Sequence, residues 1–93
     1  MIKSFKDKDT EKIYSRVGSN KLPRDIQQTA LRKLRMINNS KTINDLKVPS
    51  ANRLEKLRGD REGQLSIRIN DQWRICFKWQ NSDAHEVEIT DYH

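Results

Sequence analysis

The chain has 93 residues, of which 33% are hydrophobic and 34% are charged, and its formal net charge is +6. This length supports one hydrophobic core and therefore one domain over residues 1–93, with a thin stability margin to which a protein partner can add. The composition excludes a membrane-spanning chain, because no apolar run approaches the length of a transmembrane helix, and a disordered one, because the apolar residues recur in periodic runs.

Positive charge is concentrated in the first half of the sequence. Residues 1–49 contain twelve Lys/Arg and five Asp/Glu, a net +7, whereas residues 50–93 contain seven and eight, a net −1. This balance predicts a polyanionic or acidic partner, although an ordinary solvated basic surface accounts for the same charge. The single cysteine, Cys76, excludes an intrachain disulfide. Together with the lack of a signal-peptide pattern at the start, this predicts a cytoplasmic protein.

The opening of the sequence predicts a short strand and a short helix. Ile2, Ser4 and Phe5, interleaved with lysines, suggest a weakly signalled strand. Asp9 or Thr10 is then expected to cap a brief helix, with Gly18 near its end.

A longer helix follows, in which Pro23 occupies the first turn, Asp25 places a negative charge near the N-terminus, and residues 38–40 form the end. Its apolar residues recur at helical spacing and define a buried face, Ile26, Ala30, Leu34 and Ile37. Its basic residues occupy the other faces, Arg24, Arg32, Lys33 and Arg35. They fit either a stripe that meets RNA or an ordinary solvated helix surface.

Beyond a helical turn at residues 42–46 and a break at Pro49, the apolar period changes from helical to alternating. A short strand flanked by Leu54 and Leu57 leads into a charged turn at residues 59–63. Three further strands are predicted, at residues 65–69, 73–79 and 86–90, with turns at residues 70–71 and 81–83. Their expected inner face consists of Leu65, Ile67, Ile69, Trp73, Ile75, Phe77, Val87 and Ile89. The predicted fold class is α+β, with N-terminal helices packed on one face of a small, mainly antiparallel sheet.

The common catalytic signatures are absent from the sequence. Two histidines and one cysteine cannot assemble a zinc cluster, and the three glycines form no phosphate-binding loop. We therefore expect neither a metal nor any other cofactor.

Ionisable groups on the strands remain as the candidates for chemistry. Arg58 precedes the Gly59 turn, Arg74 lies on the polar face of a strand, and Asp91, Tyr92 and His93 end the sequence. Cutting RNA without a metal requires a base for the ribose 2′-hydroxyl proton, an acid for the leaving 5′-oxygen, and cations for the phosphorane charge. The two guanidinium groups suit the phosphate and the imidazole suits proton transfer.

The terminal residues have distinct expected roles. The carboxylate that ends the sequence beside His93 favours the imidazolium form, which suits a general acid better than a base. Asp91 can orient the imidazole, and Tyr92 can stack on a base or hydrogen-bond a phosphate. On spacing alone this evidence is weak, since chain ends are often frayed.

Three segments of the sequence resemble the HigB, or plasmid-maintenance killer, branch of the RelE/ParE toxin superfamily. They are residues 57–68, LRGDREGQLSIR, residues 70–77, NDQWRICF, and residues 91–93, DYH; residues 1–6, MIKSFK, resemble the family's start. Each motif alone is modest, but together they are specific, and the resemblance extends over essentially the whole chain.

The resemblance implies a RelE-like fold and a ribosome-dependent, metal-independent mRNA endonuclease that cuts in the ribosomal A site by attack of the 2′-hydroxyl. It implies a HigA-type helix-turn-helix antitoxin as partner, with operator DNA bound only through that antitoxin. Carried onto this sequence, the active-site residues are Arg58, Arg74, Asp91, Tyr92 and His93. The cations expected to contact RNA are Arg53, Lys56, Arg61, Arg68 and Lys78.

The sequence departs from the family pattern at two positions. Some members carry Lys in place of Arg58, and some carry His in place of Glu55. An arginine stays protonated, so Arg58 is expected to stabilise charge and not to transfer protons. A glutamate near a phosphate is unfavourable unless it acts as a base. We therefore expect a weaker or more conditional nuclease.

Two alternatives share these features. A ParE-like gyrase inhibitor has the same fold, but it has no stated need for the terminal Asp91-Tyr92-His93 group. A basic RNA-binding or antitoxin-type module without catalysis fits the charge alone.

Overall fold

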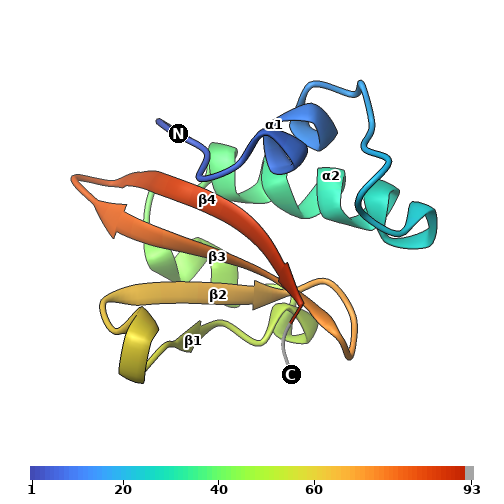
Figure 1. The fold of residues 1–93 in the computed structure, drawn as a ribbon. Coiled ribbons are helices and arrows are strands. Elements are labelled where there is room, and N and C mark those ends of the chain that lie inside the picture. Colours follow the sequence, from blue (N-terminus) through green and yellow to red (C-terminus); the bar gives the residue numbers. More distant parts are fainter. Residues whose placement is uncertain (92–93) are drawn as a thin grey trace.

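A four-stranded antiparallel sheet with strand order β1-β2-β3-β4 forms the centre of the computed structural model, which describes residues 1–91 (Figure 1). The strands are β1 (Glu55–Lys56), β2 (Gln64–Arg68), β3 (Trp73–Gln80) and β4 (Asp83–Asp91). Two helices, α1 (Lys8–Tyr14) and α2 (Arg24–Asn39), pack on one face of this sheet. Three short 3-10 helices connect the remaining elements, η1 (Ile43–Lys47), η2 (Ser50–Asn52) and η3 (Gly59–Arg61).

Helix α1 begins earlier than the sequence predicts. Its N-cap is Asp7, whose carboxylate accepts hydrogen bonds from the backbone N–H of Thr10 (3.2 Å) and from the Thr10 hydroxyl (2.7 Å). The predicted cap at Asp9 or Thr10 is therefore wrong. Thr10 is instead fully buried, and its hydroxyl oxygen accepts a hydrogen bond from the Ile89 backbone (2.9 Å). A tertiary contact with β4 thus decides between neighbouring residues that are equally able to cap a helix.

The N-terminal segment lies along the outer edge of β4. Ile2 and Phe5 form parallel bridges with Ala84 and Val87, and the N–H of Lys3 donates to the Ala84 carbonyl (2.8 Å). The weak opening strand of the sequence thus takes the form of isolated bridges. They cover the backbone groups of β4 that would otherwise form an open sheet edge.

Helix α2 supplies the larger part of the helical side of the core. The four residues of the predicted buried face, Ile26, Ala30, Leu34 and Ile37, are all buried. Pro23 is the N-cap, one position before the predicted first turn. Lys33, predicted to lie on a solvent face, is buried as well, with 6% of its surface exposed. The prediction for Lys33 was wrong because a charged residue outside the apolar positions of a helix is expected to face solvent, unless a buried partner for it is known.

Alternation along the strands separates an inner from an outer face of the sheet. Of the eight residues predicted for the inner face, seven are buried, and Trp73 is partly buried against the same cluster. Strand β4 starts at Asp83, three residues before its predicted start. Glu86 has a positive φ (51°) and lies where the β3–β4 register shifts, between Cys76 and Lys78. This irregularity breaks the alternation of apolar and polar residues, so the sequence pattern does not predict the first three residues of the strand.

Candidate active site

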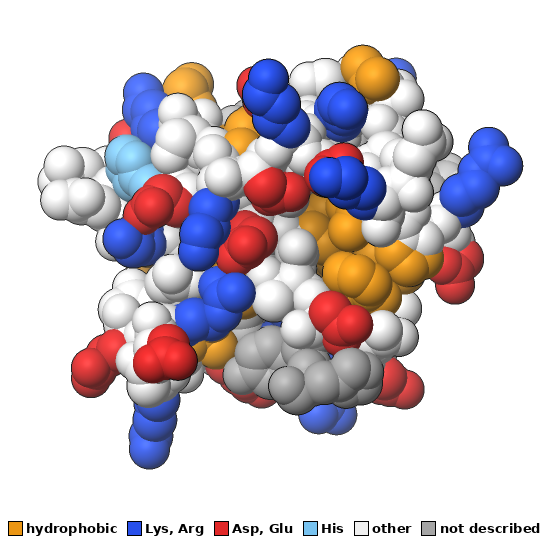
Figure 2. Space-filling view, in the orientation of Figure 1, with side chains coloured by type: hydrophobic (Ala, Val, Ile, Leu, Met, Phe, Trp, Pro, Cys, Tyr) orange, Lys and Arg blue, Asp and Glu red, His pale blue; other side chains and the backbone are white. Residues whose placement is uncertain are grey.

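The outer face of the sheet, turned away from α1 and α2, carries polar side chains from all four strands. The cross-strand register aligns Glu55, Ser66, Cys76 and Glu88 in one row. A second row aligns Arg68, Arg74 and Thr90, and a third aligns Gln64, Lys78 and His85. We call these residues the outer face. Figure 2 shows acidic and basic side chains interspersed over part of this side of the molecule.

Arg74 is the most constrained side chain of the outer face. Its Nε donates a hydrogen bond to the Ser66 hydroxyl (2.8 Å), and its Nη2 donates to the carbonyl oxygens of Arg53 (2.6 Å) and Ser66 (3.3 Å). Its Nη1 lies 3.9 Å from the Glu55 carboxylate. Only 6% of Arg74 is exposed, whereas 49% of the Glu55 side chain is. The protein therefore fixes one edge of the guanidinium plane and leaves Nη1 beside a half-exposed carboxylate.

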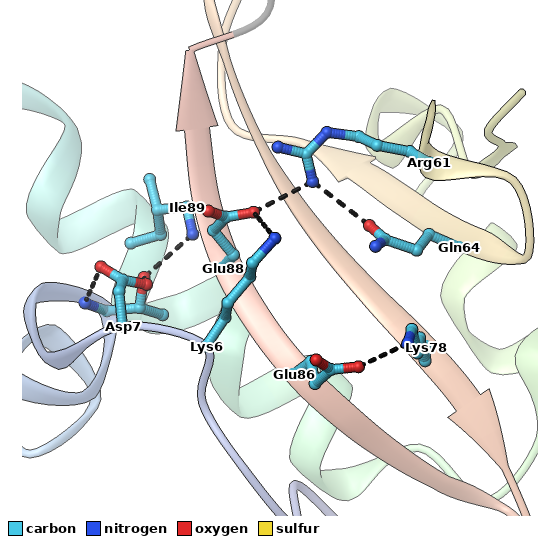
Figure 3. A network of polar contacts seen from close by, with 9 residues as sticks. Lys6, Asp7, Arg61, Gln64, Lys78, Glu86, Glu88 and Ile89 are labelled. Carbon is cyan, nitrogen blue, oxygen red and sulfur yellow. Dashed lines mark hydrogen bonds and ion pairs between the residues drawn. The ribbon is translucent and has the colours of Figure 1, made fainter. Parts of the chain in front are cut away.

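A second group of charges centres on Glu88, next to the Arg74 row (Figure 3). Arg61 Nη1 donates to the Glu88 carboxylate (3.0 Å) and to the Gln64 side-chain oxygen (3.3 Å), and Lys6 Nζ lies 3.9 Å from the same Glu88 oxygen. Three side chains from the N-terminal segment, η3 and β4 thus converge over the sheet. They balance one carboxylate against two cations, which leaves net positive charge.

The remaining outer-face cations are also paired with carboxylates. Lys78 Nζ lies 2.6 Å from the Glu86 carboxylate (Figure 3), and a hydrogen bond from Lys78 lowers the pKa of Glu86. Arg68 pairs with Asp71 in the β2–β3 turn. To bind the cations of this face, a phosphate must therefore displace the carboxylates that are paired with them.

The end of β4 brings Asp91 to the same end of the sheet as Arg74, but strand alternation directs its side chain to the inner-face side, with Trp73, and not to the outer face. Asp91 pairs in register with Trp73, the residue before Arg74, and its carboxylate accepts a hydrogen bond from the Gln72 amide (3.0 Å). The sequence-based candidates Tyr92 and His93 lie outside the described residues. Of the candidate catalytic set, Arg74 and Asp91 therefore share one end of the sheet.

Arg58 lies at the other end of β2. It precedes η3, is exposed, and follows Leu57, whose N–H donates to the Gln64 carbonyl (2.9 Å) at the start of β2. Strand β2 runs from this end to Arg68 in four steps, roughly 13 Å at the usual rise per residue. The backbones of Arg58 and Asp91 are therefore not adjacent, and only the length of the Arg58 side chain and of a bound RNA can connect them.

The cations expected to contact RNA occupy different positions. Arg61, Arg68 and Lys78 belong to the outer-face pairs described above. Arg53 is exposed and contributes its carbonyl to Arg74. Lys56 is opposite Leu65, whose side chain belongs to the inner face, so strand alternation directs Lys56 away from the outer face.

Sequence reasoning missed the residues that hold Arg74 in place. Ser66 and the Arg53 carbonyl are not chemically conspicuous, and Glu88 reads as an ordinary strand-surface charge. The sequence did show polar residues at every second position, in residues 64, 66 and 68 and in residues 86, 88 and 90. This alternation predicts a polar face of the sheet, but it does not show which residues of that face form a site.

Side chains that commonly hold metal ions do not gather in the described part of the chain. Among residues 1–91, no group of three or more His, Cys, Asp or Glu is arranged to hold a metal ion. Burial raises the pKa of the Cys76 thiol, which keeps it protonated and unreactive. Within the same residues, no helix combines the length and apolarity needed to cross a membrane.

Comparison with known proteins decides the family. A model of the HigB-like family, described as the RelE-like toxin of a type II toxin–antitoxin system, matches residues 3–93. The chain belongs to this family. It is 38% identical over 85 residues to Toxin HigB-1 of Vibrio cholerae, covering 90% of each chain. It is 33% identical over 93 residues to Endoribonuclease HigB of Proteus vulgaris, covering the whole of both.

Solved structures confirm the RelE-like fold predicted for this HigB-family chain. The YoeB–YefM complex from Staphylococcus aureus contains a chain with a TM-score of 0.61 and 19% identity, covering 100% of this chain and 98% of that one. A YafQ variant from E. coli gives a TM-score of 0.63 at 13% identity, covering 98% and 93%. At these identities the likeness concerns the fold alone.

Proposed function

We propose that this HigB-family toxin is an endoribonuclease that cuts translated mRNA in the ribosomal A site without a metal and thereby inhibits growth. The observation that carries the proposal is the Arg74–Glu55 pair, an oriented arginine beside a half-exposed carboxylate on the polar face of a RelE-like sheet. The full-length similarity to a protein named Endoribonuclease HigB supports the same activity.

In the proposed reaction the scissile phosphate binds beside Arg74 Nη1, and Glu55 swings from this nitrogen to the ribose. Glu55 removes the 2′-hydroxyl proton, because Arg74 and Arg58 stay protonated and cannot act as bases. The 2′-oxygen forms a bond to phosphorus while the bond to the 5′-oxygen breaks. His93 donates a proton to that leaving oxygen, with Asp91 orienting it. The products are a 2′,3′-cyclic phosphate and a 5′-hydroxyl end.

Arg74 suits the charge-stabilising role because its geometry is fixed before RNA binds. Three hydrogen bonds to Ser66 and Arg53 hold the guanidinium in place, so little reorganisation is needed when negative charge develops on the phosphorane. Arg61 and Lys78 supply charge for neighbouring phosphates once their carboxylate partners are displaced. Arg58, at the far end of β2, is suited to a phosphate further along the mRNA. Tyr92 is proposed to stack on a base.

The partners follow from the family. We propose a HigA-type helix-turn-helix antitoxin, with operator DNA bound through it, the 70S ribosome with its mRNA, and a cytoplasmic location. The type II toxin–antitoxin description of the family supports the antitoxin. An open groove on α1 and α2, lined by Arg16, Arg32 and Arg35 around Ile13 and Leu31, is the candidate surface for the antitoxin or for ribosomal RNA.

The family match favours this activity over gyrase inhibition. The matching model describes a RelE-like toxin, and a relative aligned over the whole of both chains is named for RNA cleavage. The order in which translation and replication stop after induction separates the two activities.

The direct test is mRNA cleavage in a purified translation system, with and without ribosomes. We expect the wild-type chain to cut only when ribosomes are present, and the chain lacking His93 to cut neither way. Failure of the wild-type chain to cut under both conditions would refute the proposal.

A further inference from the structure

Lys33 of α2 is a buried cation without an acidic partner among the described residues. Only 6% of it is exposed, and within residues 1–91 no carboxylate lies at ion-pair distance from its Nζ. Burial, together with the charges of Arg32 and Arg68, lowers its pKa. A buried ammonium in this setting is unfavourable for folding, so its presence calls for a reason other than stability.

The contacts of Lys33 lead to η2. Its Nζ donates a hydrogen bond to the side-chain oxygen of Asn52, which is fully buried, and the Asn52 amide donates to the Leu46 carbonyl at 3.2 Å. Asn52 is thereby held between α2 and η1. The Asn52 amide also lies 3.8 Å from the Met36 sulfur of α2. The segment that follows has no regular structure until β1 begins at Glu55, so these contacts of Asn52 and the packing of Leu54 hold it to the helical side.

The residue after Asn52 reaches the candidate active site. Arg53 adopts a left-handed conformation with a φ of 44°, which is unfavourable for a non-glycine residue and requires support from its neighbours. In this conformation its carbonyl accepts the 2.6 Å hydrogen bond from Arg74 Nη2. Two residues later, Glu55 lies beside Arg74 Nη1. The segment therefore contacts both terminal nitrogens of the same guanidinium.

We propose that Lys33 and Asn52 are positioning residues for the nuclease, which hold residues 52–55 so that the Arg53 carbonyl and the Glu55 carboxylate frame Arg74. This inference rests on the proposed function, in which Arg74 and Glu55 act on the RNA. Neither Lys33 nor Asn52 touches the substrate. They act through a single turn of backbone, and a small displacement of that turn misplaces both groups at once.

A double variant of Lys33 and Asn52 distinguishes a positioning role of this pair from a purely structural one. Replacing both members of a buried polar pair by apolar residues of similar size leaves no unpaired group between them and is often close to neutral for stability. K33M leaves the Asn52 side-chain oxygen unpaired, and N52L leaves the Lys33 ammonium unpaired. The double variant removes both of these groups and shares with N52L only the loss of the donor to the Leu46 carbonyl. If the link only stabilises the fold, activity will recover with stability. If it positions Arg74 and Glu55, stability will recover without activity.

The experiment measures ribosome-dependent cleavage and thermal unfolding for wild type, K33M, N52L and the double variant, with K41Q as a control at an exposed lysine. We expect the double variant to unfold at a higher temperature than N52L, which leaves the buried ammonium unpaired. We also expect its cleavage rate at saturating ribosome complex to stay about 10- to 100-fold below wild type, with ribosome affinity unchanged. Recovery of the rate together with the unfolding temperature, or a wild-type rate in K33M, would overturn the proposal.

A second measurement stays informative if these variants fold poorly or if the wild-type chain does not cut RNA. K33Q removes the charge but keeps a donor, and the Arg74 Nε–H signal in a ¹⁵N NMR spectrum reports directly on the guanidinium. We expect this signal to shift and its exchange with water to quicken in K33Q. An unchanged signal would reject the positioning link, and a changed signal without wild-type cleavage would reject only the proposed function.

Discussion

The two faces of the sheet are built from the same strands and are buried to a similar degree at their centres, but different forces compensate for that burial. On the inner face, Ile67, Ile75 and Phe77 are fully buried against apolar side chains. On the outer face, Ser66 is fully buried and Arg74 is 6% exposed. On the outer face, hydrogen bonds from Arg74 to the Ser66 hydroxyl and the Arg53 carbonyl take the place of the dispersion contacts that stabilise the inner face.

This difference indicates a division of labour between the faces. Apolar packing tolerates exchange among residues of similar volume, whereas a guanidinium with three directional bonds does not. Changes on the inner face should therefore act through the free energy of unfolding, and changes on the outer face should act mainly through cleavage.

The largest effect is expected at Glu55. E55Q keeps the size of the side chain but removes the proposed base, so the cleavage rate should fall by about 10²- to 10⁴-fold. Stability should change little, because the pair with Arg74 is half exposed on the Glu55 side. A companion variant combines E55H with R58K and so restores the residues found in some family members. It should cut faster than wild type. Equal cleavage by wild type and this companion variant would contradict the weakened-nuclease expectation.

Phe77 tests the inner face. It is fully buried among core residues, and F77A should lower the free energy of unfolding by about 3–5 kcal/mol, as measured by urea denaturation. The cleavage rate per folded molecule should stay near that of wild type. If F77A is as stable as wild type but inactive, the two faces do not divide stability and activity in this way.

Arg61 tests the charges around Glu88. R61Q removes one of the two cations on this carboxylate and leaves Lys6, so ribosome binding should weaken modestly and its dependence on salt should decrease by about one phosphate contact. The measurement is the ribosome dissociation constant at several salt concentrations. An unchanged salt slope would exclude Arg61 from the RNA contact.

The smallest effect concerns pH and the pair of Lys78 with Glu86. Because a hydrogen bond from Lys78 lowers the Glu86 pKa, the pair contributes stability at pH values above the usual glutamate pKa of about 4.3. That contribution is lost as the pH falls through the lower pKa of the folded state. Thermal unfolding of wild type should therefore be slightly more sensitive to acid than that of K78M. Identical acid sensitivity would argue against this pair.

The inner face was predictable from the sequence because each of its residues carries the signal by itself. Leu65, Ile67 and Ile75 are apolar at alternate positions, and no partner needs to be known. Arg74 was predictable in the same way, as a cation on the opposite face. By contrast, the start of β4 depends on a bulge at Glu86, and the cap of α1 depends on a contact between Thr10 and Ile89.

The supports of the candidate site were not predictable for a similar reason. The contact between Arg74 and the Arg53 carbonyl depends on backbone conformation, since any residue type offers a carbonyl. The contact between Lys33 and Asn52 joins residues 19 positions apart through a loop with no periodic pattern. Sequence patterns identify side chains that face one way, whereas these contacts depend on how separate elements meet.

The most direct test of the central claim uses an mRNA with a single 2′-deoxy nucleotide at the position that the wild-type toxin cuts on the ribosome. We expect that this position is no longer cut, because the attacking 2′-oxygen is missing, while neighbouring positions and an unmodified message are still cut. Cleavage of the 2′-deoxy position at the unmodified rate would show that the bond is broken by another nucleophile and would refute attack by the 2′-hydroxyl.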